Sequence, residues 1–306
     1  MMIIEKGENP LVISNLDDVV NNIEKKYKKE QRVIQWKKIS VNKLVVTGSI
    51  MVFFVLLLTL LTPFIAKYDP VAINPIDRMK GPSVEHFFGT DNLGRDVFSR
   101  VLFGARSSLM VAVFVALFST VIGTVIGLLT SYYRVLDNIM MRIMDGIMAI
   151  PEILLAIALM AALGPSKVNI IIALSIIFVP SIARTVRSAA LAVKEIPFVE
   201  ALKASGANSS RIIFYHILPN CMSSLLVQVT FVFAYSIIVE ASLSFLGLGT
   251  PPPAPSWGTI LQEGATVIDV AWWMTAFPGL AIMITVIGLN LLGDGIRDLL
   301  DPHSNE

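Results

Sequence analysis

The chain has 306 residues, of which 55% are hydrophobic and only 15% are charged, and its formal net charge is +1. Soluble domains carry about 25% charged residues, so this composition excludes a soluble enzyme and a disordered chain. The small net charge also excludes the basic surface that a nucleic-acid-binding protein needs. The single cysteine, Cys221, excludes a disulfide framework and a cysteine-rich metal site. The class that remains is an integral membrane protein with several spans.

Long apolar runs predict an all-α integral membrane protein with about six transmembrane helices. A bilayer core is about 30 Å thick, and roughly 20 mostly apolar helical residues cross it. In chain order the expected spans are Leu44–Ala66, Ser107–Tyr133, Gly146–Leu163, Val168–Ala183, Ser223–Leu248 and Ala271–Leu292.

The distribution of lysine and arginine predicts that the N- and C-termini are both cytoplasmic. These residues are concentrated in the N-terminal segment and in the loops that share its side, whereas the loop 249–270 has neither. The expected parts of the chain are a cytoplasmic segment 1–43, a six-span domain 44–301 with a long extracytoplasmic loop 67–106 and a cytoplasmic loop 194–220, and a C-terminal tail 302–306.

The N-terminal segment contains a stretch with the spacing of an amphipathic helix. Apolar residues recur at helical intervals beside a cluster of lysines, and they are Leu16, Val19, Val20, Ile23 and Tyr27. A basic amphipathic helix binds the anionic inner leaflet of a membrane, so membrane lipid is one expected partner. The alternative is a helix that is exposed to solvent or packed against another protein.

Sequence motifs of the common catalytic sites are absent. The chain has no G-x-x-x-x-G-K-[ST] loop for a triphosphate, no H-E-x-x-H and no G-x-S-x-G. Its three histidines, His86, His216 and His303, are scattered, which disfavours a metal site. We therefore expect a non-catalytic conduit or scaffold without a metal or cofactor of its own, and an intramembrane enzyme is disfavoured.

The segment from Lys194 to Asn220 predicts a rigid structure that projects into the cytoplasm. A short amphipathic helix is expected over 198–205, and Gly206 allows a sharp turn after it. Ser209 or Ser210 is expected to cap a second short helix, and Pro219 suits the first turn of the fifth span. Because both ends continue into spans, such a structure transmits motion from a soluble partner.

Residues of this segment resemble the E-A-A…G…I-x-L-P loop of the membrane subunits of ABC importers. The matching residues are Glu200, Ala201, Leu202, Gly206, Ile217, Leu218 and Pro219. The third position is leucine rather than alanine, and His216 replaces an isoleucine, as in the peptide-importer branch. The resemblance implies that this loop docks on an ATPase subunit. The alternative is an amphipathic loop that only packs beneath the membrane.

A second set of motifs resembles the C-type permease of dipeptide, oligopeptide and nickel importers. The motifs are F-G-T-D-N-L-G-R-D-V-F-S-R at 88–100, E-A-S-L-S-F-L-G-L-G at 240–249 with S-W-G at 256–258, and G-D-G-I-R-D at 293–298. In this order they cover about 45–301.

This resemblance implies the permease architecture of a type I ABC importer in the bacterial inner membrane. It implies a heterodimer with a second homologous permease, two ABC ATPase subunits that hold ATP and magnesium, and an extracytoplasmic substrate-binding protein. Peptides are the expected substrate, and nickel or a metal chelate is the alternative. A secondary carrier or channel without an ATPase is the alternative from a different class.

Polar residues in and beside the spans are candidates for the translocation path. Glu152 and Glu240 lie inside predicted spans, where charged residues are costly and usually face water or the bundle interior. A carboxylate there meets the ammonium group of a peptide, and the alternative role is contact between helices. Asp145 is expected on the same helix face as Glu152, paired with Arg142. In the outer loop, Asp91 is expected to cap a helix that starts near Asn92.

Overall fold

The computed structural model describes residues 41–300, and the regular elements in that range are all helical. The α-helices are α2 (Lys43–Ile65), α3 (Val97–Tyr132), α4 (Arg134–Met148), α5 (Glu152–Leu163), α6 (Lys167–Lys194), α7 (Pro197–Ala204), α8 (Ser209–Arg211), α9 (Leu218–Phe245), α10 (Trp257–Ala265) and α11 (Trp273–Leu300). A 3-10 turn η1 (Pro75–Asp77) and a π-helical segment η2 (Ile212–Ile217) complete them. The expected amphipathic helix near the N-terminus lies outside the described residues.

The prediction of an all-α membrane protein with about six spans is confirmed. Within residues 41–300, five helical stretches are each long and apolar enough to cross a bilayer: α2, α3, α6, the continuous run α8–η2–α9 and α11. The pair α4 and α5 passes the same test only when both helices are taken together.

The third predicted span, Gly146–Leu163, is wrong as a single helix. Helix α4 ends at Met148, α5 begins at Glu152, and their axes differ by 91°. The physical reason is Pro151, which has no N–H group and disfavours helical backbone at Ile150. The prolines inside α6 and α11 leave those helices continuous, so only Pro151 interrupts a predicted span.

Helix α3 is longer than its predicted span, because it begins at Val97 instead of Ser107. The Asp96 carboxylate accepts a hydrogen bond from the backbone N–H of Ser99 at 2.8 Å, which is a standard N-terminal cap. The last ten residues of the predicted outer loop 67–106 are therefore helical. The cap moves to Asp96, and the predicted helix start near Asn92 is wrong.

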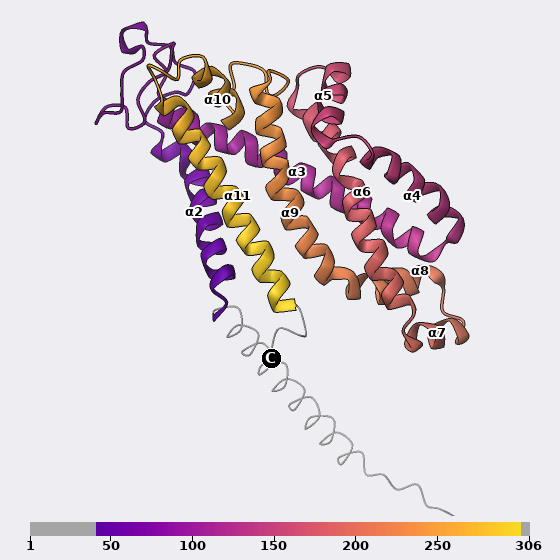
Figure 1. The fold of residues 1–306 in the computed structure, drawn as a ribbon. Helices are drawn as coiled ribbons and strands as arrows, with labels where there is room; N and C mark the ends of the chain where they lie inside the picture. The colour runs from indigo at the N-terminus through magenta and orange to yellow at the C-terminus, as the bar shows by residue number, and fades with distance from the viewer. Residues whose placement is uncertain (1–40, 301–306) are drawn as a thin grey trace, which may run out of the picture.

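The helices form an open bundle in which α2 and α11 lie side by side at one edge and α4 and α5 lie at the other (Figure 1). Helix α3 crosses the bundle and packs most extensively on α6. Two glycines of α3 permit this close contact, since a Cβ atom at Gly127 would lie 2.6 Å from the carbonyl oxygen of Ala183. Small residues at such crossings are typical of membrane helices.

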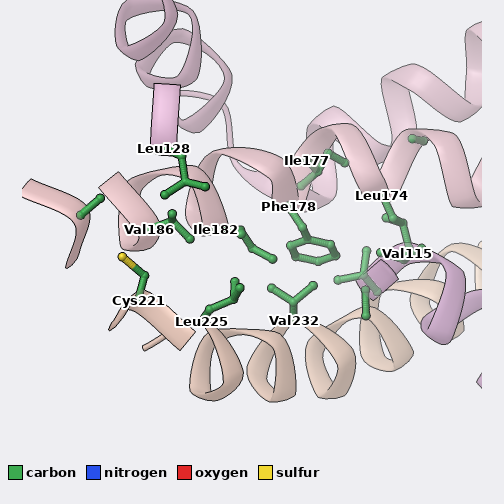
Figure 2. Close-up of a cluster of buried hydrophobic side chains, with 14 of the residues drawn as sticks. Val115, Leu128, Leu174, Ile177, Phe178, Ile182, Val186, Cys221, Leu225 and Val232 are labelled. Carbon is green, nitrogen blue, oxygen red and sulfur yellow. The ribbon is translucent and has the colours of Figure 1, made fainter. Parts of the chain in front are cut away.

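The main hydrophobic core lies between α3, α6 and α9. Figure 2 shows Phe178 and Ile182 of α6 directed toward Leu225 and Val232 of α9. The core also includes the segment that precedes α9 in the chain, because Ile212, Ile213 and Ile217 are buried in the same cluster. The loop 194–220 is thus a continuation of the core between α3, α6 and α9.

The loops are divided between the two ends of the bundle. Helix α10 and the segment between α2 and α3 lie at one end, and α7 and α8 lie at the opposite end (Figure 1). The start of α2 and the end of α11 lie at the end that carries α7 and α8 (Figure 1). This arrangement agrees with termini on the same side as the loop 194–220, and the cytoplasmic assignment of that side stays a prediction.

Candidate functional site

The predicted ATPase-coupling loop folds into a compact knob, which we define as residues 194–220. Helix α7 starts with Pro197 in its first turn and buries Val199 completely. Leu202 packs partly against the core, while Glu200 and Ala201 are exposed. One side of α7 is therefore anchored in the protein, and the motif residues at 200 and 201 are presented outward.

Gly206 ends α7 in the way the sequence predicts. Its φ is +80°, a backbone conformation that residues with a side chain rarely adopt. The N–H of Ala207 donates to the carbonyl of Leu202, and the N–H of Gly206 donates to the carbonyl of Lys203, both at 3.0 Å. These are the two hydrogen bonds of a Schellman motif, which closes the C-terminus of a helix.

The second half of the knob differs in detail from the prediction. Asn208, not Ser209 or Ser210, caps α8, since its side chain accepts a hydrogen bond from the N–H of Ser210 at 3.2 Å. The π-helical segment η2 then leads into α9, with Ile217 buried and Leu218 partly buried. Pro219 lies in the first turn of α9 and is exposed.

Contacts with α3 fix the knob to the bundle. The Lys194 ammonium donates to the carbonyl oxygen of Ser131 at 2.9 Å and lies 5.7 Å from the ring centre of Tyr132. Lys203 of α7 approaches the same ring at 5.6 Å. The end of α6 and helix α7 therefore both contact the end of α3.

An open cavity of about 320 Å³ lies between α5, α6, α9 and α11, and Glu152 borders it. Polar and aromatic side chains from four helices contribute to its lining, and they are Glu152, Ser181, Gln228, Tyr235, Asn290, Phe178 and Phe231. The lining offers both hydrogen-bond acceptors and donors on an otherwise apolar wall. Gln228, Tyr235 and Ser181 did not stand out in the sequence, because single polar residues in apolar runs carry no motif.

Glu240 has a different environment from Glu152. Its side chain is completely buried, and its Oε1 accepts a hydrogen bond from the Ser244 hydroxyl at 2.8 Å. The residue does not border the cavity that contains Glu152. The structure thus separates the two carboxylates that the sequence singled out.

Two ion pairs connect α4 to α6. Asp145 accepts a hydrogen bond from Arg184 at 2.8 Å, and Asp137 is bound by Arg187 at 2.5 and 2.7 Å. The predicted pair between Arg142 and Asp145 is wrong, because α6 supplies the partner. The predicted shared face of Asp145 and Glu152 is also wrong, since the bend places them on different helices.

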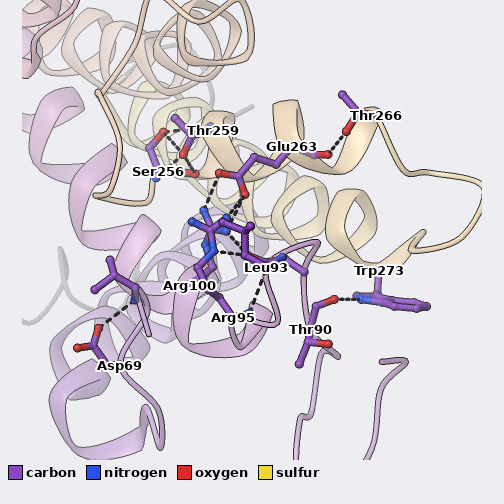
Figure 3. A network of polar contacts seen from close by, with 12 residues as sticks. Asp69, Thr90, Leu93, Arg95, Arg100, Ser256, Thr259, Glu263, Thr266 and Trp273 are labelled. Atoms are coloured by element: carbon purple, nitrogen blue, oxygen red, sulfur yellow. Dashed lines mark hydrogen bonds and ion pairs between the residues drawn. The ribbon is translucent and has the colours of Figure 1, made fainter. Parts of the chain in front are cut away.

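At the end of the bundle opposite the knob, charged residues of the motif at 88–100 form a buried ion network (Figure 3). Asp91 binds both Arg95 and Arg100, and these arginines also bind Glu263 of α10, Arg95 at 2.7 Å and Arg100 at 2.6 and 3.1 Å. The other oxygen of Asp91 accepts the backbone N–H groups of Leu93 and Arg95. Asp91 therefore closes a turn and does not cap a helix. The network joins the outer loop to α10.

Residues 41–300 contain no group of three or more His, Cys, Asp or Glu side chains arranged to hold a metal ion. The scattered histidines include His86, whose Nδ1 lies 2.9 Å from the Asp96 carboxylate at the start of α3. That contact supports a helix end rather than a metal site.

Comparisons with known proteins identify the family. The family model described as "Binding-protein-dependent transport system inner membrane component" matches residues 119–305, and the model of the N-terminal TM domain of oligopeptide transport permease C matches residues 31–82. The second match starts before residue 45, where the motifs place the beginning of the resemblance, so it includes the last part of the N-terminal segment 1–43.

Curated relatives align with most of the length of this chain. The chain is 49% identical over 256 residues to a Brucella suis protein named as a permease of a peptide transport system, covering 84% of this chain and 86% of the relative. It is 44% identical to the dipeptide transport system permease protein DppC of Alkalihalophilus pseudofirmus, with 87% and 88% covered. It is 42% identical to the glutathione transport system permease protein GsiD of Pectobacterium atrosepticum, with 87% and 89% covered.

A solved structure has the same fold. Inward-facing MetNI methionine ABC transporter aligns with a TM-score of 0.53 at 22% sequence identity, covering 66% of this chain and 97% of that chain. At this identity the match supports the fold alone. Together with the sequence matches, it shows that the chain belongs to the binding-protein-dependent transport family and is a multi-pass permease of the ABC-importer type in the bacterial inner membrane.

Proposed function

We propose that this permease imports di- or oligopeptides, which an extracytoplasmic binding protein delivers at the outer end and which leave on the cytoplasmic side. Curated relatives named for peptide, dipeptide and glutathione transport support this substrate class. The observation that carries the proposal is the combination of a polar cavity among the core helices with an anchored knob at one end of the bundle.

The open cavity requires other subunits to complete it. A second homologous permease covers the cavity as a heterodimer partner, and two ABC ATPase subunits bind the knobs. ATP and magnesium are bound by those ATPases, and this chain is a non-catalytic subunit without its own cofactor. Lipid surrounds the exposed apolar faces, such as that of α2, where Phe53 and Phe64 are exposed.

The mechanism follows from how the knob is attached. Closure of the ATPases on ATP displaces α7, and the contacts of Lys194 and Lys203 with the end of α3 carry that displacement into the bundle. The spans then alternate between inward and outward openings. Glu152 borders the path, and its carboxylate attracts the ammonium group of a peptide. Glu240 is the second candidate residue for the path.

The first experiment is uptake by cells that lack only this chain, with and without a plasmid copy. Labelled dipeptides, pentapeptides and nickel ions are offered separately. We expect peptide uptake to be lost in the deletion strain and restored by the plasmid. Loss of nickel uptake alone would replace the peptide substrate with a metal, and uptake that persists without the partner ATPases would favour a secondary carrier.

A second experiment tests the path. We expect Glu152→Gln to reduce peptide uptake without changing the amount of protein in the membrane. Glu240→Gln is measured beside it. If both variants transport at the wild-type rate, neither carboxylate acts on the substrate.

A further inference from the structure

A second polar pocket lies between α4 and α6, and we call it the basic pocket. Its volume is about 450 Å³, and it is lined by Asp137, Asn138, Met141, Arg142, Asp145, Arg184 and Arg187. The motifs in the sequence did not involve these residues, and the two ion pairs between α4 and α6 account for only part of their charge.

The basic pocket lies less than one helical turn along α6 from the cavity that contains Glu152. Glu152 and Ser181 border both that cavity and a smaller pocket beside the bend between α4 and α5. Ser181 and Arg184 are three residues apart on α6, so they lie on the same helix face, and the rise between them is about 4.5 Å. One face of α6 therefore leads from the cavity to the arginines, in the direction of the knob.

The basic pocket carries an excess of positive charge. Three guanidinium groups and two carboxylates line it. Arg184 pairs with Asp145 and Arg187 pairs with Asp137, whereas Arg142 makes no ion pair within the part of the chain that the structure describes. The Arg184 side chain is 51% exposed, so the pocket is open to an incoming anion. A single carboxylate would balance the unpaired charge of Arg142.

Helix α4 has an apolar side and a charged side, and this difference indicates which side faces lipid. Ile139 and Ile143 are exposed on a side without charged residues, with exposed fractions of 52% and 48%. Charged side chains avoid lipid and face a bundle interior or a water-filled path, and apolar side chains tolerate lipid. The side with Arg142 and Asp145 therefore faces the bundle interior or water and not lipid.

We propose that the basic pocket binds the C-terminal carboxylate of a peptide in transit, while Glu152 interacts with its N-terminal ammonium group. The proposal rests on the peptide import described above. Guanidinium groups bind carboxylates through charge-assisted, often bidentate hydrogen bonds. An extended chain advances by about 3.3–3.6 Å per residue, so a peptide of a few residues is long enough to reach from the Glu152 level to the arginines. The permease then selects zwitterionic chains with both ends free.

The test locates the peptide in the working transporter. The complete assembly of both permeases, the ATPases and the binding protein is reconstituted in liposomes with Asn138→p-benzoylphenylalanine, which places a photoreactive group in the basic pocket. The matched control is Ile143→p-benzoylphenylalanine on the apolar side of α4. A radiolabelled dipeptide is offered with ATP under illumination, and uptake is measured in parallel.

We expect ATP-dependent crosslinking of the dipeptide at position 138 and none at position 143. Loss of a charged hydrogen-bonding partner costs about tenfold in occupancy, so Arg142→Gln should reduce the crosslink by about that factor. Arg142→Lys should retain most of it, and Arg134→Gln, which removes a cation of α4 outside the pocket, should leave it unchanged.

The outcomes separate the two proposals. Absence of peptide uptake by the wild-type assembly would overturn the proposed function and this inference together. Normal uptake without a crosslink at position 138 would overturn the inference alone. A crosslink that Arg142→Gln leaves unchanged would also overturn it, because the guanidinium group would then not bind the carboxylate.

Discussion

The buried ion network of the outer loop predicts a measurable coupling between two residues that are far apart in the sequence. Arg100 and Asp91 are almost completely buried, with side chains that are 2% and 1% exposed. Glu263→Gln removes one of two carboxylates that balance two guanidinium groups. Removing one partner of a buried ion pair costs about 3–5 kcal/mol. Because the Glu263 side chain is 27% exposed, water compensates part of this cost, and we expect about 2 kcal/mol.

A double-mutant cycle isolates the interaction. Arg95→Met removes one cation and leaves the network with an excess of negative charge, so it should also destabilise the protein. The double variant Arg95→Met with Glu263→Gln leaves Arg100 paired with Asp91 and restores the charge balance. Its cost should be lower than the sum of the two single costs by about 2 kcal/mol, as expected for residues in one network.

The assay is the apparent melting temperature of the purified protein in detergent, measured by the fraction that remains monodisperse after heating. For a chain of this size, about 2 kcal/mol corresponds to a shift of about 3 °C. Asp269→Asn, which neutralises an exposed carboxylate beyond α10, is the matched control and should cause no shift. Additive shifts in the double variant would refute the reasoning, because they would show that the two residues act independently.

Two further predictions concern glycines whose roles differ. Gly127→Leu should greatly reduce the yield of folded protein, because the new Cβ would lie 2.6 Å from a carbonyl oxygen of α6. Gly146→Leu is the control and should be tolerated, since the space around Gly146 is open. The membrane yield after mild detergent extraction distinguishes the two variants. Gly206→Val should uncouple the knob, since its φ of +80° disfavours a branched side chain although no atom obstructs it. We expect normal membrane yield with at least a severalfold loss of ATP-dependent uptake, and unimpaired uptake would contradict the assigned role of the turn.

The elements that the sequence predicts well are those set by local physical chemistry. The apolar runs locate α2 and the start of α11 to within a few residues, and the glycine at 206 ends α7 as its backbone freedom requires. Helix α11 continues eight residues beyond the predicted end at Leu292. The buried isoleucines of η2 extend this local pattern into the core. The π-helical geometry itself carried no sequence signal.

Contacts between residues that are far apart in the chain could not be predicted from the sequence. Glu263 is 163 residues from Arg100, and no spacing rule connects them. The same holds for Arg184 of α6, which pairs with Asp145 of α4 in place of the predicted partner Arg142. The motif at 88–100 identified most members of the outer network without indicating their purpose, since the residue that completes it lies on α10.

The bend between α4 and α5 connects this local chemistry to the candidate path. If a single straight helix ran through Pro151, Glu152 would follow α4 along its axis. The break instead starts a new helix at Glu152, and this residue lies at the border of the cavity between α6, α9 and α11. Because proline disfavours helical backbone at the preceding residue, we attribute the bend to Pro151 and expect Pro151→Ala to straighten it.

The expected change in distance is large. Positions 143 and 163 are both exposed, and they would lie about 30 Å apart along a straight helix at 1.5 Å per residue. With a 91° bend near residue 150, the same rise gives about 22 Å. Spin labels at Ile143→Cys and Leu163→Cys, with Cys221→Ser, measure this distance by double electron–electron resonance. We expect about 22 Å with Pro151 and a population near 30 Å with Pro151→Ala, together with reduced peptide uptake. A distance that does not change would show that packing against α6, and not the proline, imposes the bend.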